Sequence, residues 1–177
     1  MTDKPDTKTT RIYDGKVVSL RIDAFRLPNG REAKMEIVEH ADVVHILPID
    51  DDGNLLLVKQ YRAAAGRELL ETPAGGIEPG EDLEAAAQRE LREETGRRAE
   101  SFRLLASVYS SPGFCTELNH LFLATGLSYD PLEPDADEDI SLVPVTLAKA
   151  IELVRSSQIG DAKSAAAILL YKSLTTN

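Results

Sequence analysis

Runs of hydrophobic residues separated by turn-forming residues predict β-strands in the first third of the chain. Residues 17–27 and 32–39 are two such runs, and the sequence Leu27-Pro28-Asn29-Gly30 lies between them. An Asn-Gly pair tolerates the positive φ angles of hairpin turns, so we expect these two runs to form a hairpin. A nearly continuous apolar run covers 43–48, and another run at 55–61 follows an Asp-Gly turn. These positions indicate two further strands.

The pattern becomes helical at residues 82–95, which contain Ala, Leu, Gln, Glu and Arg but neither Pro nor Gly. Asp82 is a suitable N-cap, and Gly96 stands where a left-handed C-cap residue belongs. We expect residues 1–10, which are polar, to be frayed. Strands, one helix, more strands and then helices indicate an α+β protein. The remaining predicted elements are strands at 102–109, 118–127 and 140–145 and helices at 146–156 and 161–174.

Composition and charge narrow the classes of partner. The chain has 177 residues, a mass of 19.3 kDa and a formal net charge of −10. We expect no nucleic-acid partner, because duplex binders present a basic face and the longest basic run here is Arg97-Arg98. We expect no membrane partner, because no apolar run approaches the roughly 20 residues of a membrane helix. The single cysteine, Cys115, and the polar N-terminus favour a cytoplasmic location.

The helix predicted at 82–95 carries acids on the face that should pack against the core. At about 100° per residue, Glu90 and Glu94 fall within its apolar stripe, one turn apart, and Glu93 adds a third acid nearby. The helix dipole is negative at this end, and we expect Arg89 and Arg92 to project to other sides. A divalent cation, Mg²⁺ or Mn²⁺, would supply the missing counter-charge; the alternative is a solvated, salt-bridged helix end. The apolar residues of the stripe are Leu83, Ala86, Ala87 and Leu91.

Residues 75–97 resemble the Nudix box, whose pattern is G-x5-E-x7-R-E-U-x-E-E-x-G-U, with U a bulky apolar residue. Gly75 and Glu81 match its first two positions, and Arg89-Glu90-Leu91-Arg92-Glu93-Glu94-Thr95-Gly96 matches the central part. Eight of the nine specified positions are met, and the exception is Arg97 at the last apolar position. A wider similarity covers about 13–174. The resemblance implies a Nudix fold, an α/β/α sandwich with a mixed sheet and an N-terminal antiparallel hairpin region.

The same resemblance assigns roles to the box residues. Glu90 and Glu94 would be metal ligands, joined by the backbone carbonyl of Ala74. Arg89 would pair with Glu81 and brace the loop, so Gly75, Glu81 and Arg89 are expected to be supporting residues. The implied cofactor is Mg²⁺ or Mn²⁺, and the implied reaction is hydrolysis of a pyrophosphate bond. Such ions neutralise adjacent phosphates and activate a bound water.

Features outside the box resemble the ADP-ribose pyrophosphatase branch of this family. The stretches 60–62 and 66–75 are similar to that branch, and a proline sixteen residues after Gly96 matches its specificity mark. An arginine beside a diphosphate is chemically apt, although a surface arginine at a strand end is the alternative. The residues expected to bind substrate by this resemblance are Arg62 at a phosphate, Glu71 at metal or substrate, Pro112, and Glu117 on the substrate loop.

Two acids compete for the role of catalytic base. Relatives in this branch bring a loop acid over the site, and Glu138 in the acidic loop 130–139 is the best match. The alternative for this run of acids is a solvated loop. Glu93 is the rival, but it projects about 80–100° around the helix from Glu90 and Glu94. We therefore expect Glu138 to be the base, with the aspartates of the same loop as alternatives.

The sequence predicts two regions and an enzymatic function. Residues 1–40 are expected to form an N-terminal hairpin region, which mediates homodimerisation in such relatives, and 41–177 the Nudix hydrolase domain. The predicted reaction is Mg²⁺-dependent hydrolysis of ADP-ribose, or a related nucleoside-diphosphate sugar, to AMP and a sugar phosphate. The alternatives are a pyrophosphatase for another nucleotide sugar or dinucleotide, and a non-catalytic Nudix ligand sensor. Loss of box acids would favour the sensor, but Glu90, Glu93 and Glu94 are all present.

Overall fold

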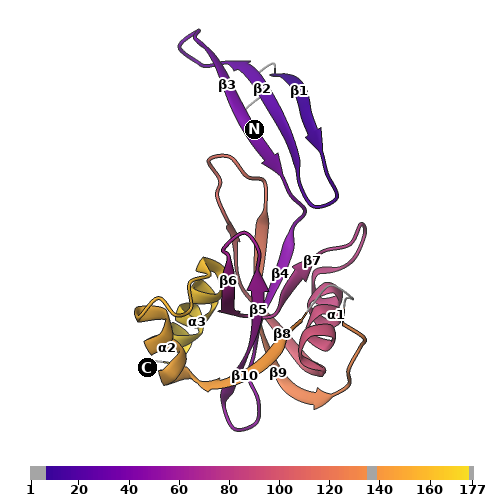
Figure 1. Ribbon diagram of the computed structural model, residues 1–177, viewed down its shortest axis with the longest axis vertical. Coiled ribbons are helices and arrows are strands. Elements are labelled where there is room, and N and C mark those ends of the chain that lie inside the picture. The colour runs from indigo at the N-terminus through magenta and orange to yellow at the C-terminus, as the bar shows by residue number, and fades with distance from the viewer. Residues whose placement is uncertain (1–6, 135–138, 176–177) are drawn as a thin grey trace. The chain divides into compact units, whose positions relative to one another are not determined.

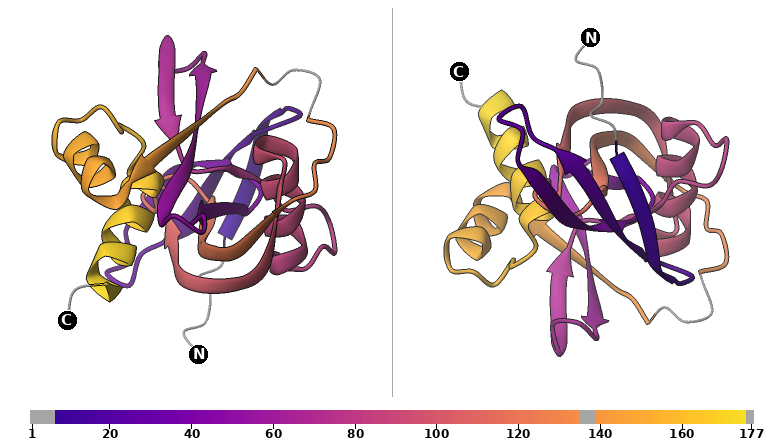
Figure 2. Two further views of the ribbon diagram at one scale, coloured as in Figure 1. Left: turned by 90° about the horizontal axis from the view of Figure 1, so that it is seen from below. Right: turned by 90° about the horizontal axis from the view of Figure 1, so that it is seen from above.

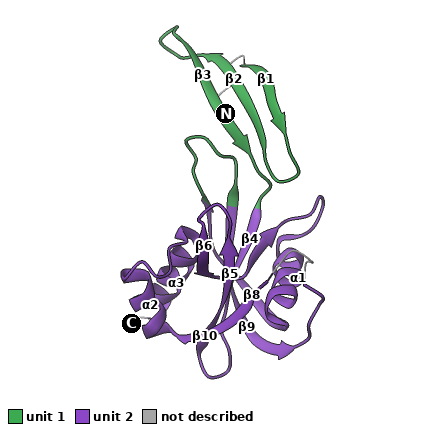
Figure 3. Ribbon diagram, viewed as in Figure 1, with its two compact units in different colours: residues 1–42, 109–118 green, residues 43–108, 119–177 purple. Residues whose placement is uncertain are grey.

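The computed structural model describes residues 7–134 and 139–175, which form two compact units (Figures 1 and 3). The N-terminal unit consists of residues 1–42 together with 109–118, and the large unit consists of 43–108 and 119–177. The chain therefore leaves the large unit once in mid-sequence, at 109–118, and returns to it. Each unit is described separately below.

The N-terminal unit contains a three-stranded antiparallel sheet in the order β1-β2-β3. Its strands are β1 (Thr7–Asp14), β2 (Ser19–Arg26) and β3 (Glu32–Glu39). The hairpin expected between β2 and β3 is confirmed, and Gly30 in its turn has a φ of 80°. The segment 109–118 adds to the edge of β3, where the Val38 N–H donates to the Phe114 carbonyl at 2.8 Å and the Thr116 N–H donates to the Val38 carbonyl at 3.0 Å.

The expectation that residues 1–10 are frayed is wrong for Thr7–Thr10, which pair with β2. Every residue of β1 is exposed, so its sequence lacks the apolar alternation by which a half-buried strand is recognised. Its contacts are polar instead: the Thr9 hydroxyl donates to Asp23 Oδ1 at 2.8 Å. Residues 7–14 therefore form a strand because they pair with β2.

The large unit contains two sheets and the helices of the molecule. One sheet is mixed, in the order β7-β4-β9-β8, with β4 parallel to β9 and antiparallel to β7. The other is antiparallel, in the order β10-β5-β6. The strands are β4 (Val43–Pro48), β5 (Asn54–Arg62), β6 (Arg67–Glu71), β7 (Ala74–Gly76), β8 (Arg97–Tyr109), β9 (Leu118–Tyr129) and β10 (Ser141–Thr146). The helices are α1 (Leu83–Thr95), α2 (Leu147–Arg155) and α3 (Ala162–Leu174).

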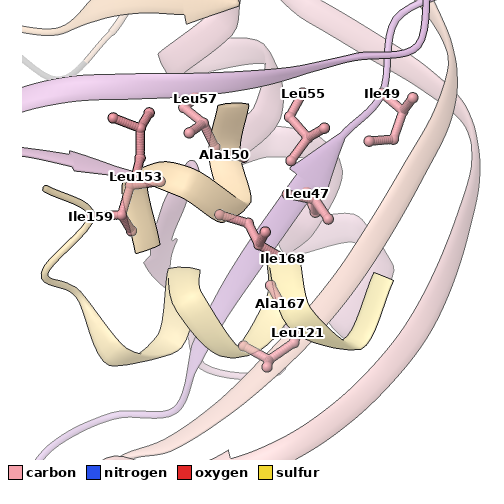
Figure 4. Close-up of a cluster of buried hydrophobic side chains, with 10 residues drawn as sticks. All are labelled: Leu47, Ile49, Leu55, Leu57, Leu121, Ala150, Leu153, Ile159, Ala167 and Ile168. Carbon is pink, nitrogen blue, oxygen red and sulfur yellow. The ribbon is translucent and has the colours of Figure 1, made fainter. Parts of the chain in front are cut away.

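Two hydrophobic cores lie on opposite faces of β4, because alternate residues of a strand point to opposite sides. Val44 and Ile46 pack with α1, whereas Leu47 packs with α2 and α3 (Figure 4). Figure 2 shows α1 in magenta on one side of the sheets and α2 and α3 in orange and yellow on the other. The expected α/β/α arrangement around a mixed sheet is therefore confirmed. None of the helices formed by the described residues combines the length and apolar character needed to span a bilayer.

The predicted caps of α1 are also confirmed. Asp82 accepts hydrogen bonds from the backbone N–H groups of Glu84 at 2.9 Å and Ala85 at 3.4 Å. Gly96 ends the helix with a φ of 67°, in the left-handed region that favours glycine. In contrast, the strands β6 and β7 were not expected from the sequence. β7 is only three residues long and includes two glycines, so its strand character comes from pairing with β4.

Candidate functional site

Two carboxylates at the end of α1 are buried in the large unit. Glu90 is 8% exposed and Glu94 is 7% exposed. Both lie near the C-terminal end of α1, whose last residue is Thr95. They lie on the same helix face as the buried residues Ala86, Ala87 and Leu91. Burying a carboxylate is costly unless charges or hydrogen bonds compensate for the lost water. The residues around this pair therefore determine what the site can bind.

Arg89 is the centre of an ion-pair cluster beside these acids. Its Nε donates to Glu81 Oε1 and its Nη2 to Glu81 Oε2, both at 3.0 Å. Its Nη1 contacts Glu90 Oε1 at 2.6 Å and Glu93 Oε2 at 3.1 Å, and its Nη2 also donates to the Gly76 carbonyl at 2.9 Å. One guanidinium thus ties the loop before α1 to the acids at its end.

The expectation that Arg89 projects to a different side from the acids is wrong. Helical geometry places its Cβ, but the long side chain carries five N–H donors and folds back over the helix end. The Arg89 hydrogen bond lowers the pKa of the Glu81 carboxyl below its usual range. In the opposite direction, the hydrogen bond to Glu81 raises the pKa of Arg89. Part of the counter-charge for Glu90 therefore comes from the protein itself.

The backbone of Ala74 and Gly75 lies directly against the two buried acids. A Cβ added to Gly75 would lie 2.0 Å from Glu90 Cδ, so only glycine allows this carboxylate to approach. The Ala74 N–H donates to Glu94 Oε2 at 3.1 Å. The site thus brings two carboxylates together with a peptide backbone that has no bulky side chain.

Arg62 and Glu71, both expected to contact substrate or metal, bind each other. Arg62 donates to Glu71 Oε2 from Nε at 2.9 Å and from Nη2 at 2.6 Å, and Glu71 is only 6% exposed. Burial opposes the charge on Arg62, but the hydrogen bond and charge of Glu71, together with the charges of Glu94 and Asp161, raise its pKa. Arg62 therefore lies in an acidic environment that includes Glu94.

A chain of buried polar side chains adjoins this site and was missed from the sequence. His45, Thr72, Asn119 and Ser164 are all buried and are joined by hydrogen bonds. The hydrogen-bonded pairs among them are 27, 74 and 92 residues apart, so no spacing rule could have grouped them.

The three remaining expected site residues are Pro112, Glu117 and Glu138. Pro112 and Glu117 belong to the N-terminal unit. Pro112 is exposed in a turn closed by the Ser111 carbonyl, and the Glu117 carbonyl accepts from the Ser110 N–H at 3.2 Å. Glu138, the expected base, lies outside the described residues.

The oxygen donors of the site suit a hard divalent cation. Among residues 7–134 and 139–175, no three His, Cys, Asp or Glu side chains are grouped so that they could hold a metal ion by themselves. Mg²⁺ does not need such a cage, because it usually keeps several waters and binds one or two carboxylates plus substrate phosphates. Glu90 and Glu94 are two buried carboxylates that could hold such an ion, and the Ala74 carbonyl is expected to join them.

The chain is similar to known proteins in sequence and in fold. Residues 39–164 match the model of the NUDIX domain. The chain is 43% identical over 160 residues to the ADP-ribose pyrophosphatase of Bacillus subtilis (strain 168), covering 89% of this chain and 86% of that protein. It is 39% identical over 163 residues to the methanol dehydrogenase activator of Bacillus methanolicus, covering 91% and 88%. The crystal structure of an ADP compounds hydrolase superposes with a TM-score of 0.87 at 25% identity, covering 97% and 94%.

Proposed function

Because the chain belongs to the Nudix family, we propose that it hydrolyses the pyrophosphate bond of ADP-ribose, or of a closely related nucleoside-diphosphate sugar, releasing AMP and a sugar phosphate. The observation that carries this proposal is the burial of Glu90 and Glu94 against the backbone of Ala74 and Gly75. The similarity to an ADP-ribose pyrophosphatase over most of the chain supports ADP-ribose as the first substrate to test.

The cofactor in this proposal is Mg²⁺ or Mn²⁺, held by Glu90, Glu94 and the Ala74 carbonyl. When bound, such an ion would neutralise the adjacent phosphates and activate a water for in-line attack. Arg89 orients Glu90 through their 2.6 Å ion pair, and it does so while anchored to Glu81. A carboxylate held in one rotamer loses less entropy when it binds a ligand, so this bracing favours binding.

The substrate contacts in this proposal are those that the resemblance to the ADP-ribose pyrophosphatase branch implies. Arg62 is placed at a phosphate and Glu71 at the metal or substrate, and the electrostatic interaction of Arg62 with Glu94 supports their nearness to the acids. Pro112 and Glu117 are proposed to contact the substrate from the segment 109–118. The ion pair between Arg62 and Glu71 would hold the guanidinium in place before a phosphate arrives.

For the catalytic base, we propose Glu138 over Glu93. Glu93 is engaged by Arg89 at 3.1 Å, and it lies off the stripe that carries Glu90 and Glu94. A general base must lie within hydrogen-bond reach of the proton that it abstracts, and the ion pair holds the Glu93 carboxylate at Arg89 instead. Glu138 would approach the substrate from its loop, which could complete the site only when substrate is bound.

The test is hydrolysis of ADP-ribose with product identification by mass. We expect AMP and ribose phosphate in the presence of Mg²⁺ or Mn²⁺, and no turnover with EDTA. Glu94→Gln should lose several orders of magnitude in kcat while folding normally, because it removes a ligand charge. Glu84→Gln is the matched control, since it neutralises an exposed acid in the first turn of the same helix. Near wild-type turnover by Glu94→Gln would contradict the assignment.

The same assay, run with a panel of nucleotide sugars and dinucleotides, distinguishes ADP-ribose hydrolysis from the alternative functions. Turnover of a different nucleotide sugar or a dinucleotide, with ADP-ribose left intact, would keep the site and change the substrate. Binding of ADP-ribose without hydrolysis of any member of the panel would indicate a ligand sensor. The full set of box acids argues against that outcome.

We also propose that the protein is a cytoplasmic homodimer and that the N-terminal unit mediates the assembly. The support for this role is that several large apolar side chains of the N-terminal unit are exposed and available to a partner. They include Ile12, Tyr13, Val17, Met35, Tyr109 and Phe114.

A further inference from the structure

The link between β6 and β7 connects two parts of the proposed site. Glu71, the last residue of β6, binds Arg62, and Ala74, the first residue of β7, donates its N–H to Glu94. Only Thr72 and Pro73 lie between them. The Pro73 carbonyl accepts from the Ile46 N–H at 2.8 Å, while Thr72 has no strand partner in the described pairings. The position of Thr72 therefore affects the Glu71 carboxylate on one side and, on the other, the Ala74 carbonyl that is proposed to bind the metal.

The backbone of Thr72 is held by the first turn of α3. Its N–H donates to Ser164 Oγ at 2.8 Å, and Ser164 Oγ donates to Asp161 Oδ2 at 2.7 Å. A carboxylate can only accept, so the direction of both bonds is determined. The same Asp161 oxygen caps α3 by accepting from the Ser164 N–H at 2.8 Å. The Thr72 N–H has no hydrogen-bond partner in a neighbouring strand of the described residues. The hydroxyl of Ser164, which is fully buried, accepts its hydrogen bond instead.

The side chain of Thr72 is held from β4 and β9. Asn119 Nδ2 donates to the Val108 carbonyl at 3.4 Å, which turns Asn119 Oδ1 toward His45 Nε2 at 3.0 Å. His45 then donates from Nε2, and its Nδ1 lies 3.4 Å from the Thr72 hydroxyl oxygen. His45 is also the residue of β4 that pairs with Ala74. The contacts from α3 and the contacts from β4 and β9 thus both end at the link between β6 and β7.

We propose that Thr72, Ser164 and His45 are positioning residues for the hydrolysis: they hold the link between β6 and β7 so that Glu71 and the Ala74 carbonyl stay aligned with Glu94. This inference rests on the proposed function. None of the three is placed at the reacting atoms, so their effect is transmitted through the link. Helix α3, distant in sequence from the box, becomes part of the scaffold of the metal site.

The chain offers variants that separate positioning from general stability. Thr72→Val keeps the shape of the side chain and removes the hydroxyl, whereas Thr72→Ser keeps the hydroxyl. Ser164→Ala removes the other arm. Ile168→Val is the matched control, because Ile168 is fully buried on the same helix but belongs to the hydrophobic core.

The experiment measures the Mn²⁺ dissociation constant of the substrate-free protein by electron paramagnetic resonance, kcat and KM for ADP-ribose, and Tm. We expect Thr72→Val and Ser164→Ala to weaken Mn²⁺ binding and lower kcat by about 10-fold or more, with little change in KM, because residues that orient metal ligands have effects of that size. Thr72→Ser should restore both values. Ile168→Val should lower Tm and leave kcat and Mn²⁺ affinity unchanged.

Wild-type kcat and Mn²⁺ affinity in Thr72→Val and Ser164→Ala would overturn the inference, as would equal losses in Ile168→Val. If Ser164→Ala does not fold, the comparison of Thr72→Val with Thr72→Ser decides the question. If the wild-type protein binds Mn²⁺ but cleaves neither ADP-ribose nor a related nucleoside-diphosphate sugar, the proposed function fails. The Mn²⁺ affinities of the variants still test the positioning role in that case.

Discussion

Gly75 and Gly76 are neighbours with the same side chain but different surroundings. A Cβ on Gly75 would meet the Glu90 carboxylate at 2.0–2.2 Å, whereas a Cβ on Gly76 would have no atom within 4 Å. Glycine at the first position therefore leaves the room that the Glu90 carboxylate occupies. The second position has no such contact.

Gly75→Ala should displace Glu90 from its buried position and lower kcat by at least about 10²-fold, the effect of misplacing a catalytic group by about 1 Å. Gly76→Ala is the matched control and should keep most of the activity. Steady-state kinetics on both variants, with circular dichroism to verify folding, makes the comparison. Equal losses in the two variants would mean that loop flexibility, and not room for Glu90, is what glycine provides.

Single substitutions can also identify the catalytic base. Glu138→Gln should cut kcat by roughly 10²–10⁴, the usual effect of losing a general base, with little change in substrate binding. Glu93→Gln should have a smaller effect on kcat, because Glu93 serves as a partner of Arg89. A large kcat loss confined to Glu93→Gln would move the base from the loop to α1.

At the element scale, α1 shows how much local sequence can specify. Its N-cap, its C-cap glycine and the face that carries Glu90 and Glu94 all follow from residues within a few turns of one another. In contrast, β1, β6 and β7 have no sequence signal strong enough to predict them, because each is short, exposed or glycine-rich. Their strand character depends on pairing with β2, β5 and β4.

Asp82→Ala should lower the free energy of unfolding by about 1 kcal/mol, because it leaves the N–H groups of Glu84 and Ala85 without their cap. Asp82→Ser should retain most of the stability, since serine is also a good N-cap. Urea denaturation with an unchanged m-value would show that the difference is one of stability. If serine destabilises as much as alanine, the cap is not the source of the effect.

At the scale of the whole molecule, the proposed dimer is the main prediction. Light scattering at micromolar concentration should give about twice the chain mass of 19.3 kDa. Ile12→Glu should shift the protein toward the monomer, because Ile12 is 53% exposed on β1 of the N-terminal unit. Leu169→Glu is the control, with 48% exposure on α3 of the large unit. A wild-type mass near that of one chain would exclude the dimer.

The sequence alone determined the helix α1, its caps, the hairpin between β2 and β3, and the spacing of the box acids. These features depend on interactions between residues that are close in the chain, so periodicity and capping rules reveal them. Only the tertiary structure decided that Arg89, which was expected to pair with Glu81, also binds Glu90 and Glu93, since the path of a long side chain does not follow from helical spacing.

The network around Thr72 was likewise decided by tertiary structure alone. Thr72 and Ser164 are 92 residues apart, and serine and threonine occur in many other places in the chain. A hydrogen bond between such residues has no sequence pattern, because it requires only that a donor and an acceptor meet in a buried place. The fold creates that meeting when β4, β9 and α3 pack around the link between β6 and β7.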